Sequence, residues 1–125
     1  MKVRDIMHSP ITIDSKAKIT DALSEMSKKH IHSLIVVSSD KIAGIITEDD
    51  ILDNLGRMSG KVSDIMTKNI KTINDEEELS EAAEVMNREG VRRLPVTKKD
   101  KLVGIITATD LLAYAGELSE VFLFD

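Results

Sequence analysis

Four short runs of apolar residues, separated by polar turns, predict two β-hairpins. Two runs, at 33–37 and 42–46, are joined by polar residues 38–41, and two more, at 94–97 and 102–106, are joined by polar residues 98–101. Short apolar segments linked by a few turn-forming residues are typical of antiparallel strands. We therefore expect one hairpin in each half of the 125-residue chain.

Helical periodicity precedes each predicted hairpin. Apolar side chains recur at helical spacing in two segments, with Ile19, Ala22, Leu23 and Met26 in the first and Leu79, Ala82, Ala83 and Met86 in the second. This spacing predicts an amphipathic helix. A short entry strand is expected before each helix, at 12–13 and 72–73, and a further helix after each hairpin, from Thr47 and Thr107. The order β-α-β-β-α, twice, predicts an α+β fold of sandwich-like character.

Polar residues mark the boundaries of the second predicted helix. The acidic run 75–78 is expected to be a solvated helix start, because negative charge is favourable at a helix N-terminus. Gly90 is placed to end the same helix.

The chain is a tandem duplication. The opening Val3-Arg4-Asp5-Ile6-Met7 recurs as Val62-Ser63-Asp64-Ile65-Met66, and from Ile13 onward the two halves align at a constant offset. We divide the chain into repeat 1, residues 1–60, and repeat 2, residues 61–125 with a short C-terminal tail. Halves of this size bury little apolar surface alone, so we expect them to pack as a pseudo-twofold pair.

Charge and composition exclude several classes of function. The chain has 17 Lys and Arg against 22 Asp and Glu, a net charge of −5, which repels nucleic acid and anionic membranes. It has no cysteine, which excludes disulfide scaffolds and thiol nucleophiles, and no apolar run approaches the roughly 18 residues of a membrane span. We expect a soluble cytoplasmic protein. The aromatic residues are Tyr114, Phe122 and Phe124, so a base bound elsewhere would lie between aliphatic side chains.

The strongest local signal is a duplicated motif at the last predicted strand-to-helix junction of each repeat. Gly44-Ile45-Ile46-Thr47 leads to Asp50, and Gly104-Ile105-Ile106-Thr107 leads to Asp110. One interpretation is structural, because a threonine followed three residues later by a carboxylate is close to a capping box. The other is functional: helix N–H groups and the hydroxyl would bind a phosphate, the carboxylate would accept ribose hydroxyls, and glycine would let a ligand approach the backbone. The duplication favours the functional interpretation.

Basic residues precede the first hairpin strand of repeat 2. Arg92 and Arg93 enter this strand and point to opposite faces, so at least one could face a cleft, and Pro95 predicts a strand edge or beginning. His32 and Ser33 stand at the same positions in repeat 1. His30 and His32 have strand spacing but no third ligand nearby, so we do not expect a metal site.

Taken together, these features resemble a tandem pair of CBS domains, also called a Bateman module, over nearly the whole chain. The resemblance rests on the Asp-Ile-Met openings, Thr-Ile before the first helix, the basic residue ahead of Leu-Pro-Val, and both Gly-x-x-Thr-x-x-Asp motifs. It implies a non-catalytic regulatory module that binds adenosine-containing ligands, such as AMP, ADP, ATP or S-adenosylmethionine, in clefts between the repeats, and requires no cofactor. It also implies ligand-binding roles for Thr12, Ile13, His32, Ile45, Thr47, Asp50, Thr72, Ile73, Arg92, Arg93, Ile105, Thr107 and Asp110.

Within this resemblance, the two Asp residues would hold ribose, the two Thr and the basic residues would contact phosphate, and backbone near 12–13 and 72–73 would read adenine. Glu48 and Asp49 stand where repeat 2 has Ala108 and Thr109, so we expect the Asp110 site to be the better phosphate site. We further expect a homodimer that signals to a protein partner in trans, with the tail at 116–124 covering a core edge or a dimer contact. The alternatives are a structural protein with empty clefts and a nucleic-acid binder that uses Arg92 and Arg93.

Overall fold

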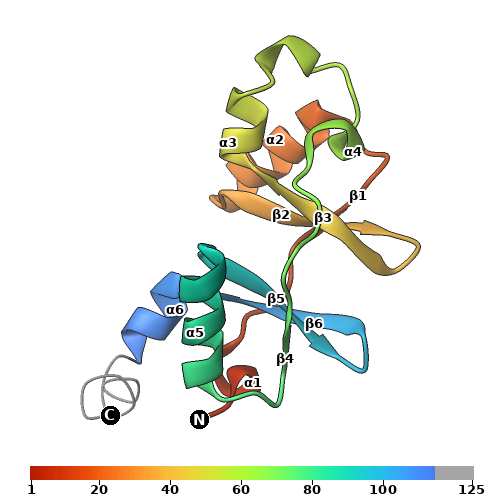
Figure 1. The fold of residues 1–125 in the computed structure, drawn as a ribbon. Helices are drawn as coiled ribbons and strands as arrows, with labels where there is room; N and C mark the ends of the chain where they lie inside the picture. Colours follow the sequence, from red (N-terminus) through yellow and green to blue (C-terminus); the bar gives the residue numbers. More distant parts are fainter. Residues whose placement is uncertain (115–125) are drawn as a thin grey trace. The chain divides into compact units, whose positions relative to one another are not determined.

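The computed structural model describes residues 1–114, so the proposed contacts of the tail at 116–124 lie outside the described residues (Figure 1). The elements follow the predicted order, and a short helix that the pattern did not reveal precedes each set. They are α1 (Val3–Ile6), β1 (Thr12–Asp14), α2 (Ile19–Lys29), β2 (Ser33–Ser38), β3 (Lys41–Thr47), α3 (Glu48–Leu52), the 3-10 turn η1 (Leu55–Arg57), α4 (Val62–Ile65), β4 (Ile73–Asn74), α5 (Leu79–Glu89), β5 (Arg93–Lys98), β6 (Lys101–Thr107) and α6 (Ala108–Ala113).

Two three-stranded sheets, β1-β2-β3 and β4-β5-β6, confirm the α+β prediction. In each sheet the first strand is parallel to the central one, and the last two strands form the predicted antiparallel hairpin. The two central residues of both hairpin turns, Ser39-Asp40 and Lys99-Asp100, have positive φ. Two such residues in succession form the turn type whose twist matches that of the flanking strands.

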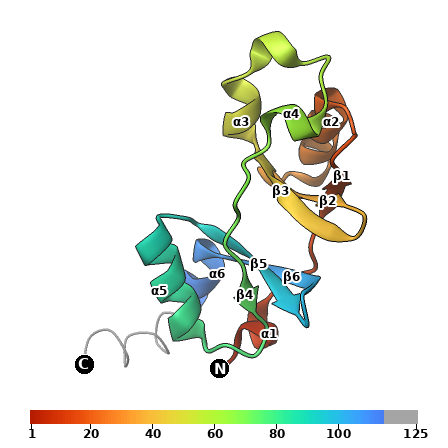
Figure 2. The same cartoon turned by 45° about the vertical axis from the view of Figure 1, so that its right-hand side comes forward.

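Each sheet packs its helices on one face and builds its own hydrophobic core (Figures 1 and 2). Alternate residues of the central strand enter the core, Leu34 and Val36 in β2 and Leu94 and Val96 in β5. The helices supply the facing side chains, among them Ile19 and Met26 from α2. Gly90 ends α5 with φ 66, as predicted, and His30 ends α2 with φ 54.

The two compact units of the structure do not coincide with the two sequence repeats, because the opening segment of each repeat belongs to the unit of the other repeat. One unit consists of residues 1–10 together with residues 71 onward, and the other of residues 11–70. Val3 N–H donates to the Glu77 carbonyl at 2.8 Å, so α1 is held by the segment that leads into α5. In the other unit, Val62 N–H donates to the Ala17 carbonyl at 2.8 Å and holds α4 in the same way. Each opening segment therefore completes the core of the other repeat's sheet.

The sequence predicted a strand edge or beginning at Pro95, and this prediction is wrong. Pro95 lies inside β5, the central strand of its sheet, in register with Ile105 of β6. In the other unit, Ile35 N–H donates to the Ile11 carbonyl at 3.1 Å, and Thr12 pairs with Ile35. Proline has no N–H to make such a bond. Pairing of β4 with β5 accordingly begins one residue later, at Ile73 and Val96.

The acidic run at 75–78 is only partly the solvated helix start that its charges predicted. Asp75 is 4% exposed, and its main-chain carbonyl accepts a hydrogen bond from Arg4 N–H at 3.0 Å. Its Oδ1 atom is buried without a hydrogen-bond partner among the described residues. Burial follows from α1, which lies against this segment and was not predicted. Across residues 1–114, no helix has the length and apolar character needed to cross a membrane.

Candidate functional site

Each repeated motif folds into a complete capping box. Thr47 is the N-cap of α3: its N–H donates to Asp50 Oδ2 at 2.9 Å, and its hydroxyl oxygen accepts from Asp50 N–H at 3.1 Å. Thr107 caps α6 with the same two bonds, at 2.8 and 3.2 Å. The structural interpretation of the motif is therefore correct. It also fixes each carboxylate in one orientation with its Oδ1 atom turned away from the cap.

A second group, supplied by an opening segment, reaches each of these Oδ1 atoms. His8 Nε2 lies 2.6 Å from Asp110 Oδ1, and Thr67 Oγ1 donates to Asp50 Oδ1 at 3.2 Å. His8 and Thr67 occupy equivalent positions, because each directly follows the Met of an Asp-Ile-Met opening. Neither was among the predicted site residues. The signal that could have found them is a polar residue at the same place in both duplicated openings.

The motif glycines make room for these opening segments. A Cβ atom on Gly44 would lie 2.5 Å from the Thr67 carbonyl oxygen, and one on Gly104 would lie 2.6 Å from Met7 Sδ. Main-chain hydrogen bonds fix the approach, with Ile45 N–H donating to the Thr67 carbonyl at 3.0 Å and Ile105 N–H to that of His8 at 2.9 Å. The expectation that glycine admits a ligand to the backbone is corrected here, because the chain itself fills that space.

Strand register gathers several predicted residues on the sheet face opposite each core. Arg93 pairs with Thr107, and in the other unit Ser33 pairs with Thr47. Residues directly opposite each other on paired strands project from the same face. Arg93 is therefore the arginine that shares a face with a motif threonine. Arg92 lies just before β5, is exposed, and accepts Ala108 N–H with its carbonyl at 2.8 Å.

The residues expected near an adenine fall on both faces of the sheets. Thr12 is in register with Ile35, which pairs with Ile45, so Thr12 and Ile45 share the face of Thr47. Ile105 holds the same place as Ile45 in the other sheet. Ile13 and Ile73 instead pack on the cores, and Thr72 lies exposed just before β4. The side chains of Ile13 and Ile73 are thus structural, which leaves only their main chain for recognition.

His32 has a carboxylate partner. Its Nδ1 atom lies 3.1 Å from Glu48 Oε2, with the two side chains 78% and 54% exposed. Glu48 N–H also donates to the His32 carbonyl at 3.0 Å. His32 is therefore paired with Glu48, rather than standing free to neutralise a phosphate. No group of three or more His, Asp or Glu within residues 1–114 is placed to hold a metal ion.

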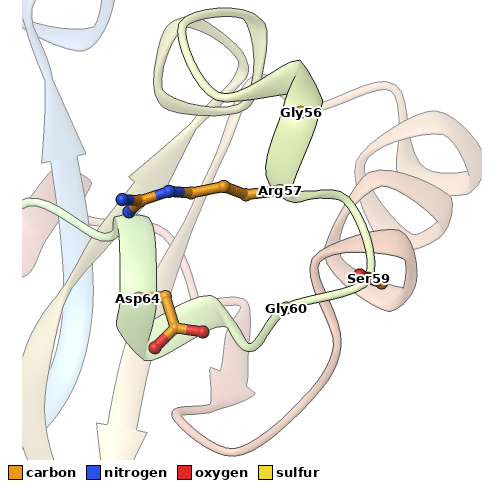
Figure 3. Close-up of a pocket in the computed structure, with 5 residues that line it drawn as sticks. All are labelled: Gly56, Arg57, Ser59, Gly60 and Asp64. Carbon is orange, nitrogen blue, oxygen red and sulfur yellow. The ribbon is translucent and has the colours of Figure 1, made fainter.

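A separate open hollow of about 490 Å³ lies beside the linker that precedes α4 (Figure 3). It is lined by Gly56, Arg57, Ser59, Gly60 and Asp64, none of which is a predicted ligand residue. The Asp64 carboxylate accepts Lys61 N–H at 2.9 Å and so belongs to the cap of α4. The lining of the hollow carries one arginine and one carboxylate, so the two charges oppose each other's effect on a phosphate.

A comparison with known protein families identifies the fold. The CBS domain model matches residues 3–57 and 62–117, which is both repeats. The chain belongs to the CBS domain family. The two matched ranges are the two halves of the duplication, each with its opening segment and its Gly-x-x-Thr-x-x-Asp motif.

Two curated proteins resemble this chain over most of its length. It is 32% identical over 125 residues to the uncharacterized protein MJ1232 of Methanocaldococcus jannaschii, covering 98% of this chain and 42% of that protein. It is 32% identical over 108 residues to inosine-5'-monophosphate dehydrogenase of Nitrosopumilus maritimus, covering 85% of this chain and 22% of the enzyme. The chain thus spans less than half of either relative.

Among solved structures, the CBS domain pair of protein MJ0100 superimposes with a TM-score of 0.82 at 28% identity, covering 94% of this chain and 97% of that one. That structure is a complex with 5-methylthioadenosine and S-adenosyl-L-methionine. The likeness extends over both repeats and shows that the fold is that of a CBS domain pair.

Proposed function

We propose that this protein is a non-catalytic regulatory module that binds adenosine-containing ligands, with Asp50 and Asp110 accepting ribose hydroxyls. The observation that carries the proposal is the pair of carboxylates, each held in one orientation by its own capping box and turned toward its opening segment. A diol binds best to a carboxylate that is already oriented, because little freedom is lost on binding. The ligands of the MJ0100 pair, 5-methylthioadenosine and S-adenosyl-L-methionine, support the adenosyl class.

Arg93 makes the unit of Asp110 the better phosphate site. It lies in register with Thr107, where the other unit has Ser33 opposite Thr47. That other unit instead places Glu48 and Asp49 in the first turn of α3. An arginine favours an anion and two carboxylates oppose it. We infer that AMP, ADP or ATP binds first beside Thr107, because Arg93 is there to meet the phosphate.

The Thr107 hydroxyl is already engaged within its own cap. Thr107 Oγ1 donates to Asp110 Oδ2 at 3.0 Å, so this hydroxyl must turn from its own carboxylate before it can donate to a phosphate. Arg93, whose five N–H groups are all donors, is therefore the principal phosphate ligand in the proposal.

The assembly and setting of the module are also proposals. Leu52 and Leu112 occupy equivalent positions in the last helix of each repeat and are 64% and 70% exposed. Large apolar side chains exposed at both duplicated positions favour a homodimer through these helices. We propose that ligand binding signals from this homodimer to a protein partner in trans. We place the homodimer in the cytoplasm, with which a chain without cysteine is compatible. A monomeric mass in sedimentation analysis would refute the dimer.

A ligand series tests the function. Thermal unfolding of the protein with AMP, ADP, ATP, S-adenosylmethionine and NAD should show a concentration-dependent rise in Tm for at least one ligand, because a ligand that binds only the folded state stabilises it. The same series on Asp50→Ala and Asp110→Ala should show the greater loss of nucleotide affinity for Asp110→Ala. No stabilisation by any ligand would leave the Thr and Asp residues as caps alone and overturn the proposal.

A further inference from the structure

The two candidate ribose carboxylates differ in the number of acceptor positions that the chain already occupies. A carboxylate offers about four lone-pair positions. Asp110 already accepts Thr107 N–H, the Thr107 hydroxyl and, on Oδ1, His8 Nε2 at 2.6 Å. Within residues 1–114, Asp50 accepts only Thr47 N–H and the Thr67 hydroxyl, which is shared between its two oxygens at 3.2 and 3.4 Å. The two hydroxyls of a ribose therefore fit the free positions of Asp50 but exceed those of Asp110.

The contact with His8 is the one that a ligand can displace most readily. The His8 side chain is 64% exposed, while the Asp110 side chain is 15% exposed and fixed by the cap of α6. The main chain of His8 is anchored independently, because its N–H donates to the Ile105 carbonyl at 2.9 Å. The imidazole can therefore swing away from Oδ1 without disturbing the opening segment.

Within the described residues, Asp110 is the charged group in hydrogen-bond contact with the His8 ring. On α6 its partner is Asp110, and β6 offers only uncharged residues, Gly104 and Ile105, beside it. On β5, Arg93 lies in register with Thr107. On its own segment, Arg4 pairs with Glu76 at 3.5 Å, and Asp5 accepts Lys2 N–H in the cap of α1. Asp110 is therefore the group whose charge the imidazole of His8 meets directly.

We propose that His8 is a gate on the Asp110 site that a ribose must displace, and that protonation of His8 closes this gate. This inference rests on the proposed binding of ribose by Asp110. A neutral imidazole donates a hydrogen bond to Oδ1 that a ribose hydroxyl, also a neutral donor, replaces like for like. A protonated imidazole adds its own positive charge to the contact with the carboxylate, and a neutral hydroxyl does not replace that charge. Since histidine changes charge between about pH 5 and 8, ligand affinity at this site falls as the pH falls.

Thr67 gives the other unit no such dependence, because a hydroxyl does not titrate in this range. The equivalent positions of His8 and Thr67 therefore allow a matched pair of variants. His8→Thr converts the Asp110 site to the arrangement seen at Asp50, and Thr67→His carries the gate to Asp50. Adenosine is the appropriate probe, because the phosphate of AMP itself titrates near about pH 6.

The test measures adenosine affinity by calorimetry at about pH 8 and about pH 5.5. In Asp50→Ala, which leaves only the Asp110 site, affinity should fall by about threefold at the lower pH, a modest value because the histidine is largely exposed. Adding His8→Thr should remove the fall, and Asp110→Ala with Thr67→His should acquire it. An unchanged pH profile in the His8→Thr variant would overturn the gate while leaving the proposed function intact.

A second readout follows the His8 ring itself. At constant pH, the ring protons of His8 should change their NMR chemical shift when adenosine is added, because the ribose displaces the imidazole from Asp110 Oδ1. If adenosine binds to none of the variants, the proposed function and the gate both fail. If adenosine binds at the Asp110 site but the ring protons of His8 keep their chemical shift, the gate alone is refuted.

Discussion

Gly44 lies so close to Thr67 that a Cβ atom at position 44 would stand 2.5 Å from the Thr67 carbonyl oxygen. This carbonyl accepts Ile45 N–H at 3.0 Å, and Ile45 in turn accepts Thr67 N–H at 2.8 Å. The pair of bonds joins the segment after α4 to the edge of β3 and brings Thr67 to Asp50. Gly44, which the motif suggested as a ligand-contact residue, thus allows the segment after α4 to contact β3.

Gly44→Ala should lower the free energy of unfolding by about 2 kcal/mol, because a main-chain oxygen cannot yield to the new methyl group as a side chain could. Gly56→Ala is the matched control, since no atom of residues 1–114 lies within 4 Å of a Cβ there, and it should change stability by less than about 0.5 kcal/mol. Urea unfolding followed by circular dichroism measures both. Equal stability of the two variants would show that the opening segment does not approach β3 as described.

Asp75→Ser should raise the free energy of unfolding by about 1 kcal/mol. Asp75 is buried, and its Oδ1 atom has no hydrogen-bond partner in the part of the chain that the structure describes; an unpaired buried polar group is costly. Serine is the residue that the duplication places at the equivalent position, Ser15, which is also buried. Glu77→Ser, at an exposed neighbour, should leave stability nearly unchanged. A destabilised Asp75→Ser protein would show that the carboxylate contributes to the fold.

Arg93→Gln should weaken AMP binding by about tenfold and leave adenosine binding almost unaltered, because the guanidinium acts on the phosphate. Arg92→Gln is the control: Arg92 is exposed, it precedes β5, and its contact with α6 is through its carbonyl. Titration calorimetry with both ligands separates the contributions. A larger effect from Arg92→Gln would reverse the assignment of the phosphate ligand.

The sequence was sufficient to predict the parts of the fold that depend on local pattern. The hairpins, the capping threonines and the end of α5 at Gly90 follow from residues adjacent in the chain. The exchange of opening segments did not follow, because hydrophobic pattern identifies an element without identifying which sheet it packs on. Helices of four residues such as α1 and α4 are also too short for a period to be recognised.

The candidate site was predictable only in part for the same reason. Asp50 and Asp110 are marked by a motif, whereas His8 and Thr67 reach them from 102 and 17 residues away. Pro95 and Asp75 were misplaced because their surroundings are set by pairing and by α1, rather than by their neighbours in sequence. Aligning the residues that follow each Asp-Ile-Met opening would have singled out His8 and Thr67.

Asp50 and Asp110 are the groups that we propose to hold an adenosyl ligand. The most direct measurement is titration calorimetry of S-adenosylmethionine and of AMP into the wild-type protein and the double variant Asp50→Ala/Asp110→Ala, with circular dichroism to confirm that the variant is folded. We predict saturable binding of at least one ligand to the wild-type protein and no detectable binding to the double variant. Undiminished binding by the folded double variant would contradict the account.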